Sequence, residues 1–495
     1  MDEDVSRNGL RQQGKVVAMM MKAMDPATHV YDTFPLGAGP KAIFSMDTRR
    51  TQVNNNTLVV GGTGAGKTIG VAYPILMHLQ HGNAVGIFTK RGMTDSIRQL
   101  LEKRGYHIYE IDFCHPETSP FGYDPLKHCL DDTDLMALSH SIIWGKKNEN
   151  DIKEPFWNNS AESLLLPVLR YVHNGLYREG SGLLDAVKLL DSIPGTSFTD
   201  WRKGRDPFDM EDGCYMYSSH DCRHELEQPS EEDLWEKYEK EGKDVFEEED
   251  QHHRKLLMRE IKRLMDSDAR DASAWEAYIN GANETRQSVM MTLQTPLMQV
   301  FTHAIRSFLQ NPREFSFEKL LEPKTVLFVY TSPVNAALGR FISIFYQQMF
   351  KCLFELAEKR EDGTLPYPVY VICDDFATGV PIDHFQDHIS IFRAKGISVT
   401  MLIQSETQLA SLYGSDNAKT IINNCDTYIY LGGMDILTAK AIAERIEWPY
   451  SDVLNLEIGR ELLFRRGQKP LSIRRYDLFR NPLYAECQRM GKIRQ

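Results

Sequence analysis

The chain has 495 residues and a formal net charge of -12; 42% of the residues are hydrophobic and 25% are charged. These values are typical of a globular chain of about two or three domains, and the negative charge excludes a protein that coats nucleic acid over its whole surface. No segment approaches the run of about 20 apolar residues that spans a bilayer, which argues against an integral membrane protein and favours the cytoplasm.

The first chemical motif follows an N-terminal arm, residues 1–45, in which we find no convincing periodicity. Thr57 to Val60 is a short apolar, β-branched run, and Ile69 to Leu79 is an apolar stretch that favours a helix. Between them the chain has Gly, four residues, then Gly, Lys and Thr, which predicts a phosphate-binding loop. Its members are Gly61, Gly62, Thr63, Gly64, Ala65, Gly66, Lys67 and Thr68.

The chemistry of such a loop follows from its residue types. Glycines let the backbone curl, so that its N–H groups and the start of the next helix point at phosphate oxygens. Lys67 is expected to reach the β- and γ-phosphates of ATP, and Thr68 to place its hydroxyl on Mg²⁺. The predicted cofactors are therefore ATP and Mg²⁺.

The order of the predicted elements indicates the fold class. Apolar residues at helical spacing dominate between about residues 130 and 320, and strand-like segments precede and follow them. Beyond the first strand we predict strands at residues 84–89, 106–111, 325–330, 367–373, 398–403 and 427–431. Alternating strands and helices imply a mostly parallel sheet. We expect an α/β nucleotide domain, residues 46–130 and 284–495, interrupted by an inserted all-α domain, residues 131–283.

Charged and metal-capable side chains are unevenly distributed. Glu225 to Asp250 contains thirteen acids and three lysines, whereas Arg460 to Arg494 contains ten bases and three acids. The acidic segment is predicted as a solvated face or a docking site for a basic partner, and the basic one as charged edge strands or phosphate contacts. One further group of metal-capable residues fits no standard zinc spacing. Its members are Cys214, His220, Cys222 and His224.

A second motif supplies the carboxylate that a Mg²⁺ ion on Thr68 needs. Val369 to Cys373 is an apolar, β-branched run followed by Asp374 and Asp375. We expect Asp374 to hold the metal, directly or through water, and Asp375 to orient or deprotonate the attacking water. Many such motors have Glu in the second position, which is one methylene longer. The pattern also fits a strand followed by an acidic turn or a helix N-cap.

Two further polar residues suit a hydrolytic motor. Gln404 follows the apolar segment Val399–Ile403, where its amide would sense the γ-phosphate or position water. Arg393 lies eighteen residues after Asp375 and would act as an arginine finger on a neighbouring subunit's nucleotide. Taken alone, a Gln after a strand also fits a solvated position, and an Arg near a helix end also fits a surface salt bridge or a cap.

Further segments resemble the TraG/TraD-type coupling proteins of conjugative type IV secretion, hexameric ATPases that link a relaxase-bound DNA strand to the transfer channel. The resemblance covers most of the chain, and its segments are specific only when taken together. They are Asn54 to Gly62, Asp124 to Leu126, Pro155 to Trp157, Glu284 to Val289, Asp374 to Ala377, Phe392 to Ser398, Gln404 to Leu409, Ile421 to Thr427 and Leu431 to Gly433.

The resemblance implies a RecA-like nucleotide domain in a DNA-stimulated, hexameric ATPase. Such a protein moves single-stranded DNA, with its relaxase, to the type IV secretion channel, and its helical domain recognises cargo. Two other functions remain alternatives. One is an FtsK/HerA-type ring for double-stranded DNA or for secreted protein, and the other is a nucleotide-gated recruitment adaptor with little turnover.

The chain also departs from the family. Phe88 to Met93 stands where the family often has Asp-Pro-Lys-Gly-Glu, and the acidic residues are lost. The N-terminal membrane helices that are usual in the family are missing, so we expect membrane association only through partners, at the inner face of the cell membrane. A truncated chain, a soluble ring that docks on the channel, and a protein of a mobilisable element that borrows another channel all fit this pattern.

Overall fold

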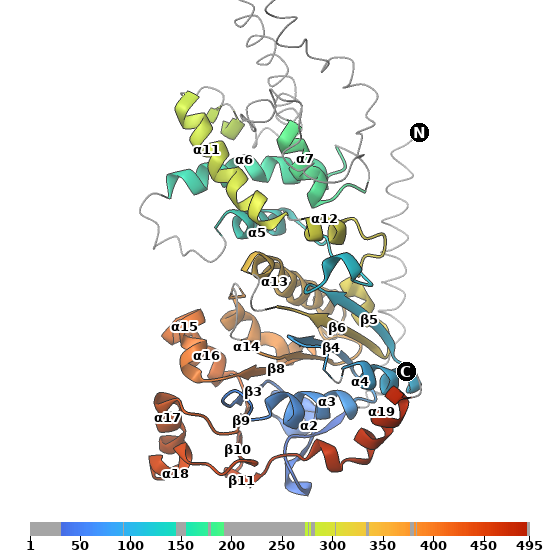
Figure 1. The fold of residues 1–495 in the computed structure, drawn as a ribbon, viewed down its shortest axis with the longest axis vertical. Helices are drawn as coiled ribbons and strands as arrows, with labels where there is room; N and C mark the ends of the chain where they lie inside the picture. Colours follow the sequence, from blue (N-terminus) through green and yellow to red (C-terminus); the bar gives the residue numbers. More distant parts are fainter. Residues whose placement is uncertain are drawn as a thin grey trace, which may run out of the picture. The chain divides into compact units, whose positions relative to one another are not determined.

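The computed structural model describes residues 31–92, 94–144, 155–176, 180–192, 273–275, 277–278, 283–301, 303–332, 336–376, 381–382 and 384–492. They form two compact units (Figure 1). The first unit takes the chain up to His128 and from Phe301 onward, and the second takes Cys129–Val300. The metal-capable group at positions 214–224 and the acidic segment lie outside the described residues, and the predictions about them stay predictions.

A nine-stranded sheet forms the centre of the first unit. In spatial order its strands are β11 (Leu471–Arg474), β10 (Arg460–Arg465), β9 (Thr427–Tyr430), β3 (Thr57–Val60), β8 (Ile397–Ile403), β7 (Val369–Cys373), β4 (Asn83–Phe88), β6 (Thr325–Tyr330) and β5 (His107–Asp112). All neighbours from β9 to β5 pair in parallel, whereas β10 is antiparallel to both β9 and β11. The expectation of a mostly parallel α/β sheet is confirmed, and the basic C-terminal stretch supplies its antiparallel edge.

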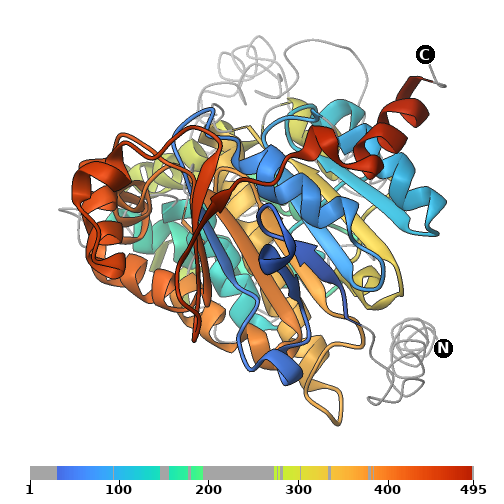
Figure 2. The ribbon, with the colours of Figure 1, turned by 90° about the horizontal axis from the view of Figure 1, so that it is seen from below.

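The direction of each connection decides which face of the sheet its helix covers. The chain runs toward the β5 edge from β3 to β4 to β5, and away from it from β6 to β7 to β8 to β9. Right-handed crossovers that run in opposite directions place their helices on opposite faces (Figure 2). The first set is η3 (Thr68–Ala72), α3 (Tyr73–Met77) and α4 (Thr94–Lys103); the second is α13 (Ala336–Glu358), α14 (Phe385–Lys395), α15 (Glu406–Tyr413) and α16 (Ser415–Asn423).

The second unit is helical. Its longer helices are α5 (Asp132–Trp144), α6 (Phe156–His173), α7 (Leu183–Ser192) and α11 (Asn283–Val300), and α6 packs against the other three. The Trp144 indole donates to Glu162 at 2.7 Å, and Arg170 pairs with Asp132 at 2.9 Å. Helix α11, which the sequence pattern places at the return to the nucleotide domain, belongs to this helical unit.

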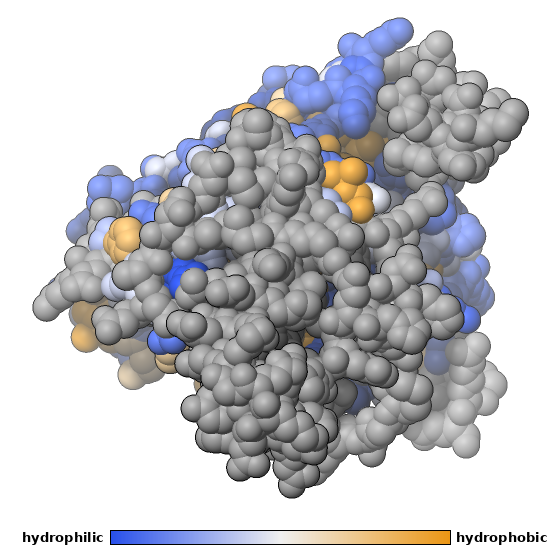
Figure 3. Space-filling view, turned by 90° about the horizontal axis from the view of Figure 1, so that it is seen from above, coloured by the Kyte–Doolittle hydropathy of each residue, from blue (hydrophilic) through white to orange (hydrophobic). Residues whose placement is uncertain are grey.

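On the face of the molecule seen in Figure 3, the described residues are mainly polar. The hydrophobic residues on this face are few and separate from one another. Within the described part of the chain, no helix is long and apolar enough to cross a membrane.

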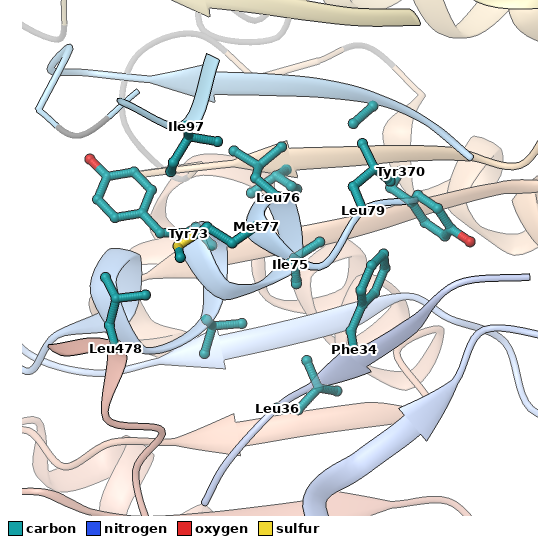
Figure 4. Packing of buried hydrophobic residues seen from close by; sticks show 14 of the residues in the cluster. Phe34, Leu36, Tyr73, Ile75, Leu76, Met77, Leu79, Ile97, Tyr370 and Leu478 are labelled. Carbon is teal, nitrogen blue, oxygen red and sulfur yellow. The ribbon is translucent and has the colours of Figure 1, made fainter. Parts of the chain in front are cut away.

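One face of the sheet is covered by α3, α4, α19 (Pro482–Lys492) and a small hairpin of β1 (Thr33–Pro35) and β2 (Ile43–Ser45). Figure 4 shows Phe34 and Leu36 of the hairpin packed near Ile75 and Tyr370, and the rings of Phe34 and Tyr370 lie 4.9 Å apart. The hairpin falls in the N-terminal arm, where the sequence shows no convincing periodicity. Its three-residue strands are too short to show an alternating pattern, and their burial against the sheet stabilises them.

Aromatic side chains fill the opposite face. The ring of Phe350 on α13 lies 4.8 Å from that of Phe392 on α14, and the ring of Phe376 lies 4.9 Å from that of Phe385. Because both faces are covered, the central strands are buried throughout, which explains their continuous apolar sequences. The remaining described elements of the first unit are η2 (Pro40–Ala42), α2 (Thr48–Thr51), η4 (Pro116–Thr118), α12 (His303–Leu309), η8 (Phe317–Leu321), α17 (Ile436–Ile446), α18 (Tyr450–Leu454) and η9 (Leu478–Arg480).

An acidic residue is buried at the antiparallel edge. Glu461 of β10 has no exposed surface, and neither carboxylate oxygen has a hydrogen-bond partner among the described residues. It lies so close to Gly37 that a Cβ there would stand 2.0 Å from its Oε1. Burial raises the pKa of Glu461 to about 8, although the charge of Arg475 opposes this rise. The folded chain therefore holds this carboxyl in its neutral form at pH 7.

We expect Glu461→Gln to remove a pH dependence of stability. Between the ordinary pKa of 4.5 and about 8, the carboxyl is ionised in the unfolded chain and protonated in the folded one. The folded state binds the extra proton, so stability falls as the pH rises through this window. Relative to Glu461→Gln, the wild-type chain should lose more than about 1 kcal/mol of unfolding free energy between about pH 5.5 and 7.5 in urea titrations. The exposed Glu457→Gln is the matched control, and equal slopes for both variants would contradict the assignment.

Candidate functional site

The phosphate loop lies at the edge where the parallel strands end. Strand β3 ends at Val60, and the loop is tied to both neighbouring strand ends: Gly61 N–H donates to the Ile403 carbonyl at 3.2 Å, and Gly62 N–H to the Gly432 carbonyl at 2.9 Å. Within the loop, Gly64 and Gly66 have φ values of 78° and 86°. Only glycine takes this left-handed conformation without a steric cost, which explains both positions.

The side chain of Lys67 closes back over the loop. Its Nζ donates to the carbonyl of Gly61 at 2.7 Å and lies 3.4 Å from that of Gly62. Lys67 is 7% exposed, and burial lowers the pKa of its ammonium group, while Asp375 and Asp374 oppose this shift. A phosphate group in the loop would give this half-desolvated cation an anionic partner in place of the carbonyl oxygens of Gly61 and Gly62.

The helix after the loop begins with a wide turn. Residues Thr68–Ala72 form a π-helix, in which Tyr73 N–H donates to the Thr68 carbonyl. Pro74 has no N–H to donate to the Gly70 carbonyl, and its ring crowds that carbonyl, so the bonding shifts by one residue. The wide turn comes directly after the phosphate loop.

The predicted metal ligands meet at the same edge. The Thr68 hydroxyl donates to both carboxylate oxygens of Asp374, at 3.1 and 3.0 Å. Burial and the charge of Asp375 raise the pKa of Asp374, while Thr68 and Lys67 oppose the rise. These oxygens suit a hard cation such as Mg²⁺. In the described residues no group of three or more His, Cys, Asp or Glu could hold a metal, so the ion would need further ligands from phosphate and water.

Asp375, the predicted base, has an unusual backbone. Its φ is 53°, and its side chain is half-buried. The next residue, Phe376, donates its backbone N–H to the Leu402 carbonyl at 3.0 Å. A non-glycine residue in this region stores strain of about 1–3 kcal/mol, and such strain is frequent at functional sites. Asp375 also acts electrostatically on both Lys67 and Asp374, so the three charges lie within one site.

Gln404 and Arg393 lie at opposite ends of the parallel strands, one after β8 and the other before it. Gln404 follows β8, which lies between β3 and β7, so its exposed side chain belongs to the edge of the phosphate loop. Arg393 lies near the end of α14, before β8 begins, and its Nη2 donates to the Thr48 carbonyl at 3.3 Å. It lines a pocket of about 660 Å³ together with Arg49. One chain therefore keeps Arg393 away from its own phosphate loop.

Two asparagines before β3 have structural partners that sequence reasoning did not assign. The Asn56 amide accepts from Val399 N–H at 3.1 Å and donates to the Asn424 carbonyl at 3.1 Å. Asn54 N–H donates to the Asp426 carboxylate at 2.6 Å. These bonds tie the start of β3 to both neighbouring strands. The only signal in the sequence was the position of these asparagines in the segment that resembles the coupling proteins.

One basic residue of the site was also missed. Arg475 follows β11, and its Nη1 donates to the carbonyl of Ala65 inside the phosphate loop. Sequence reasoning placed this residue only in a basic C-terminal stretch. Nothing local to the sequence connects it to the loop, because the contact spans 410 positions.

The sequence of the chain matches a known family. A family model described as "Type IV secretory system Conjugative DNA transfer" matches residues 1–446. The comparison with curated proteins finds no match.

Solved structures of conjugative coupling proteins share the fold. The bacterial conjugative coupling protein TrwBdeltaN70 in a trigonal form with sulphate has a TM-score of 0.54 at 16% identity, covering 86% of this chain and 88% of that chain. Its unbound monoclinic form has the same TM-score and identity, and the match covers 94% of this chain and 91% of that chain. The plasmid coupling protein TrwB in complex with the non-hydrolysable ATP analogue ADPNP has a TM-score of 0.51 at 15% identity, covering 86% and 87%. At these identities the likeness shows the fold.

A pair of variants should separate the roles of the two adjacent carboxylates. We expect Asp374→Asn to weaken Mg²⁺-dependent binding of ATP about tenfold or more, because the cation loses its charged protein ligand, while binding in EDTA changes little. Asp375→Asn should leave ATP affinity nearly unchanged and reduce turnover by about 10²-fold or more, the scale for loss of a general base.

Calorimetric titration with ATP, with and without Mg²⁺, and steady-state phosphate release would measure the two effects. The exposed Asp416→Asn controls for loss of one negative charge. A fully active Asp375→Asn protein would place the catalytic carboxylate elsewhere.

Proposed function

Because the chain belongs to the family of conjugative DNA transfer proteins of type IV secretory systems, we propose that it is an ATP-driven coupling protein. It recruits DNA together with its relaxase and pumps the DNA, as a single strand, to the secretion channel. The observation that carries the proposal is the phosphate loop whose Lys67 and Thr68 face Asp374 at one edge of the sheet.

The nucleotide is ATP, bound through residues 61–68. Backbone N–H groups of the loop and the Lys67 ammonium bind the phosphates, and Thr68 with Asp374 holds Mg²⁺, which neutralises phosphate charge when bound. The complex of the similar protein TrwB with ADPNP supports this choice of nucleotide. The oxygen-only donor set of Thr68 and Asp374 supports the choice of metal.

Hydrolysis is assigned to three side chains. Asp375 accepts a proton from the water that attacks the γ-phosphorus, and the bond to the β–γ bridging oxygen breaks to release ADP and phosphate. Gln404, on the strand end between the phosphate loop and Asp375, positions that water. Arg393 neutralises the charge of the transferred phosphoryl group from a neighbouring subunit.

The position of Arg393 supports a ring. Its side chain is exposed at the end of the sheet opposite to the phosphate loop, so it completes a site only across a head-to-tail contact with a second copy. Head-to-tail contacts that close on themselves give a ring, for which we propose a hexamer. Membrane association occurs through the channel components with which this ring assembles.

DNA and nucleotide effects together test the function. We expect the rate of ATP hydrolysis per subunit to rise with protein concentration, because rings complete the site, and to rise further with single-stranded DNA. Stimulation by double-stranded DNA alone would favour an FtsK/HerA-type ring. A rate that no DNA changes would reject a DNA motor in favour of a protein-secretion ATPase or, if turnover is negligible, a recruitment adaptor.

Mixing two inactive variants tests the action of Arg393 between subunits. Lys67→Ala should abolish hydrolysis, and Arg393→Ala should impair it while ATP binding survives. In a random equimolar mixture about one interface in four joins an intact Lys67 to a neighbour's intact Arg393, so about a quarter of the wild-type rate should return.

The control replaces Lys67→Ala in the mixture with the double variant Lys67→Ala/Arg393→Ala, which has no arginine to contribute and should restore nothing. No recovery in verified mixed rings would place the action of Arg393 within one subunit.

A further inference from the structure

Arg475 contacts the phosphate loop from the side opposite to the acidic residues. In the sheet, β7 with Asp374 lies on one side of β3, and β9, β10 and β11 lie on the other. Arg475 directly follows β11, and its backbone N–H donates to the Gly459 carbonyl at 2.8 Å. From there its guanidinium reaches the carbonyl of Ala65 in the loop.

Two glycines make room for this side chain. A Cβ on Gly66 would lie 2.7 Å from Cζ of Arg475, and a Cβ on Gly70 would lie 2.9 Å from its Cδ. The left-handed φ of Gly66 already requires glycine, but Gly70 has no positive φ. Glycine inside a helix is about 0.5–1 kcal/mol less favourable than alanine, so helix formation does not explain glycine at position 70. The space that the aliphatic stem of Arg475 occupies does explain it.

The guanidinium of Arg475 has donors to spare. It carries five N–H groups, and in the described part of the chain it makes one side-chain hydrogen bond, to Ala65, and no ion pair. The buried acid nearby, Glu461, makes no hydrogen bond or ion pair with it, and burial raises the pKa of Glu461 to about 8 although the charge of Arg475 opposes this rise. A half-buried cation without a counter-ion therefore stands beside a loop built for anions.

The direction of the reaction places the leaving group on this side. In phosphoryl transfer the attacking oxygen, the phosphorus and the leaving oxygen lie roughly in line. If Asp375 activates the water from the β7 side of the loop, as proposed above, the leaving ADP lies on the side of β9 to β11. The α- and β-phosphates, which ATP and ADP share, would then lie on the side of Arg475.

We propose that Arg475 is a second cation of the nucleotide site within the same chain, which binds the α- and β-phosphates that ATP and ADP share. On binding, its Nη1 exchanges the Ala65 carbonyl for phosphate oxygens. No proton is transferred, because the guanidinium stays charged throughout. The proposal rests on the proposed function as an ATPase and adds a ligand that acts on ADP and ATP alike, in contrast to Arg393, which acts on the γ-phosphoryl group.

Nucleotide titration tests this role. We expect Arg475→Ala to weaken the binding of both ADP and ATP by the same factor, about tenfold or more, because one charge-assisted contact to the shared phosphates is lost. Arg475→Lys should restore part of the affinity, since it keeps the charge but not the fork of donors. Arg474→Ala, an exposed neighbour on β11, is the matched control and should bind both nucleotides like the wild type.

A second variant separates ligand binding from folding. Gly70→Ala keeps Arg475 but displaces its stem, and alanine favours the helix, so ADP affinity should fall without loss of thermal stability. In the double variant Gly70→Ala/Arg475→Ala the two effects should not add, because both act through one side chain.

The outcomes separate the two proposals. If the wild-type chain binds no ADP, or if the Lys67→Ala variant binds ADP with the same affinity as the wild type, the proposed nucleotide site is wrong. If Lys67→Ala loses ADP binding while Arg475→Ala retains wild-type affinity for ADP, only the role of Arg475 is overturned. A loss confined to DNA binding in Arg475→Ala, or to thermal stability, would also overturn it.

Discussion

The parallel pairing of β3 with β8 and β9 is the constraint on which the site depends. In this register Val60 lies beside Ile403 and Tyr430, so the segments that follow these strands leave the sheet at one level. Strand β7 ends at the same edge because it pairs in parallel with β8. Thr68 and Asp374 are 306 positions apart in the sequence, yet the backbone ladder brings their oxygens within hydrogen-bond distance. The chemistry is therefore a consequence of strand order.

The same edge holds charges in a partly desolvated place. Burial lowers the pKa of Lys67 and raises that of Asp374, so each charged form is less favourable there than in water. A phosphate chain and a cation would supply the missing counter-charges, and their interactions would be stronger than at an open surface. The left-handed backbone of Asp375 adds strain at the same point. The charges that would bind the nucleotide and the cation are therefore the same ones that the fold holds in position before binding.

The two ends of the sheet explain why the proposed site needs more than one chain. Arg475 reaches the phosphate loop within the chain because β11 brings it to the correct edge. Arg393 precedes β8 and lies at the other end, beside Thr48. Residues that precede and follow the strands of a parallel sheet cannot meet in one copy, whereas head-to-tail contact joins the two ends. In the proposed ring, turnover depends on assembly while nucleotide binding does not.

The sequence by itself determined the phosphate loop, the strand before Asp374 and the mostly parallel sheet. These rest on local patterns: glycines where φ is positive, apolar β-branched runs, and strands that alternate with helices. Tertiary structure alone decided the contact of Arg475 with Ala65, the left-handed Asp375 and the hairpin at residues 33–45. The physical reason is that these features arise from packing between distant segments, and such packing leaves no periodic pattern in either segment.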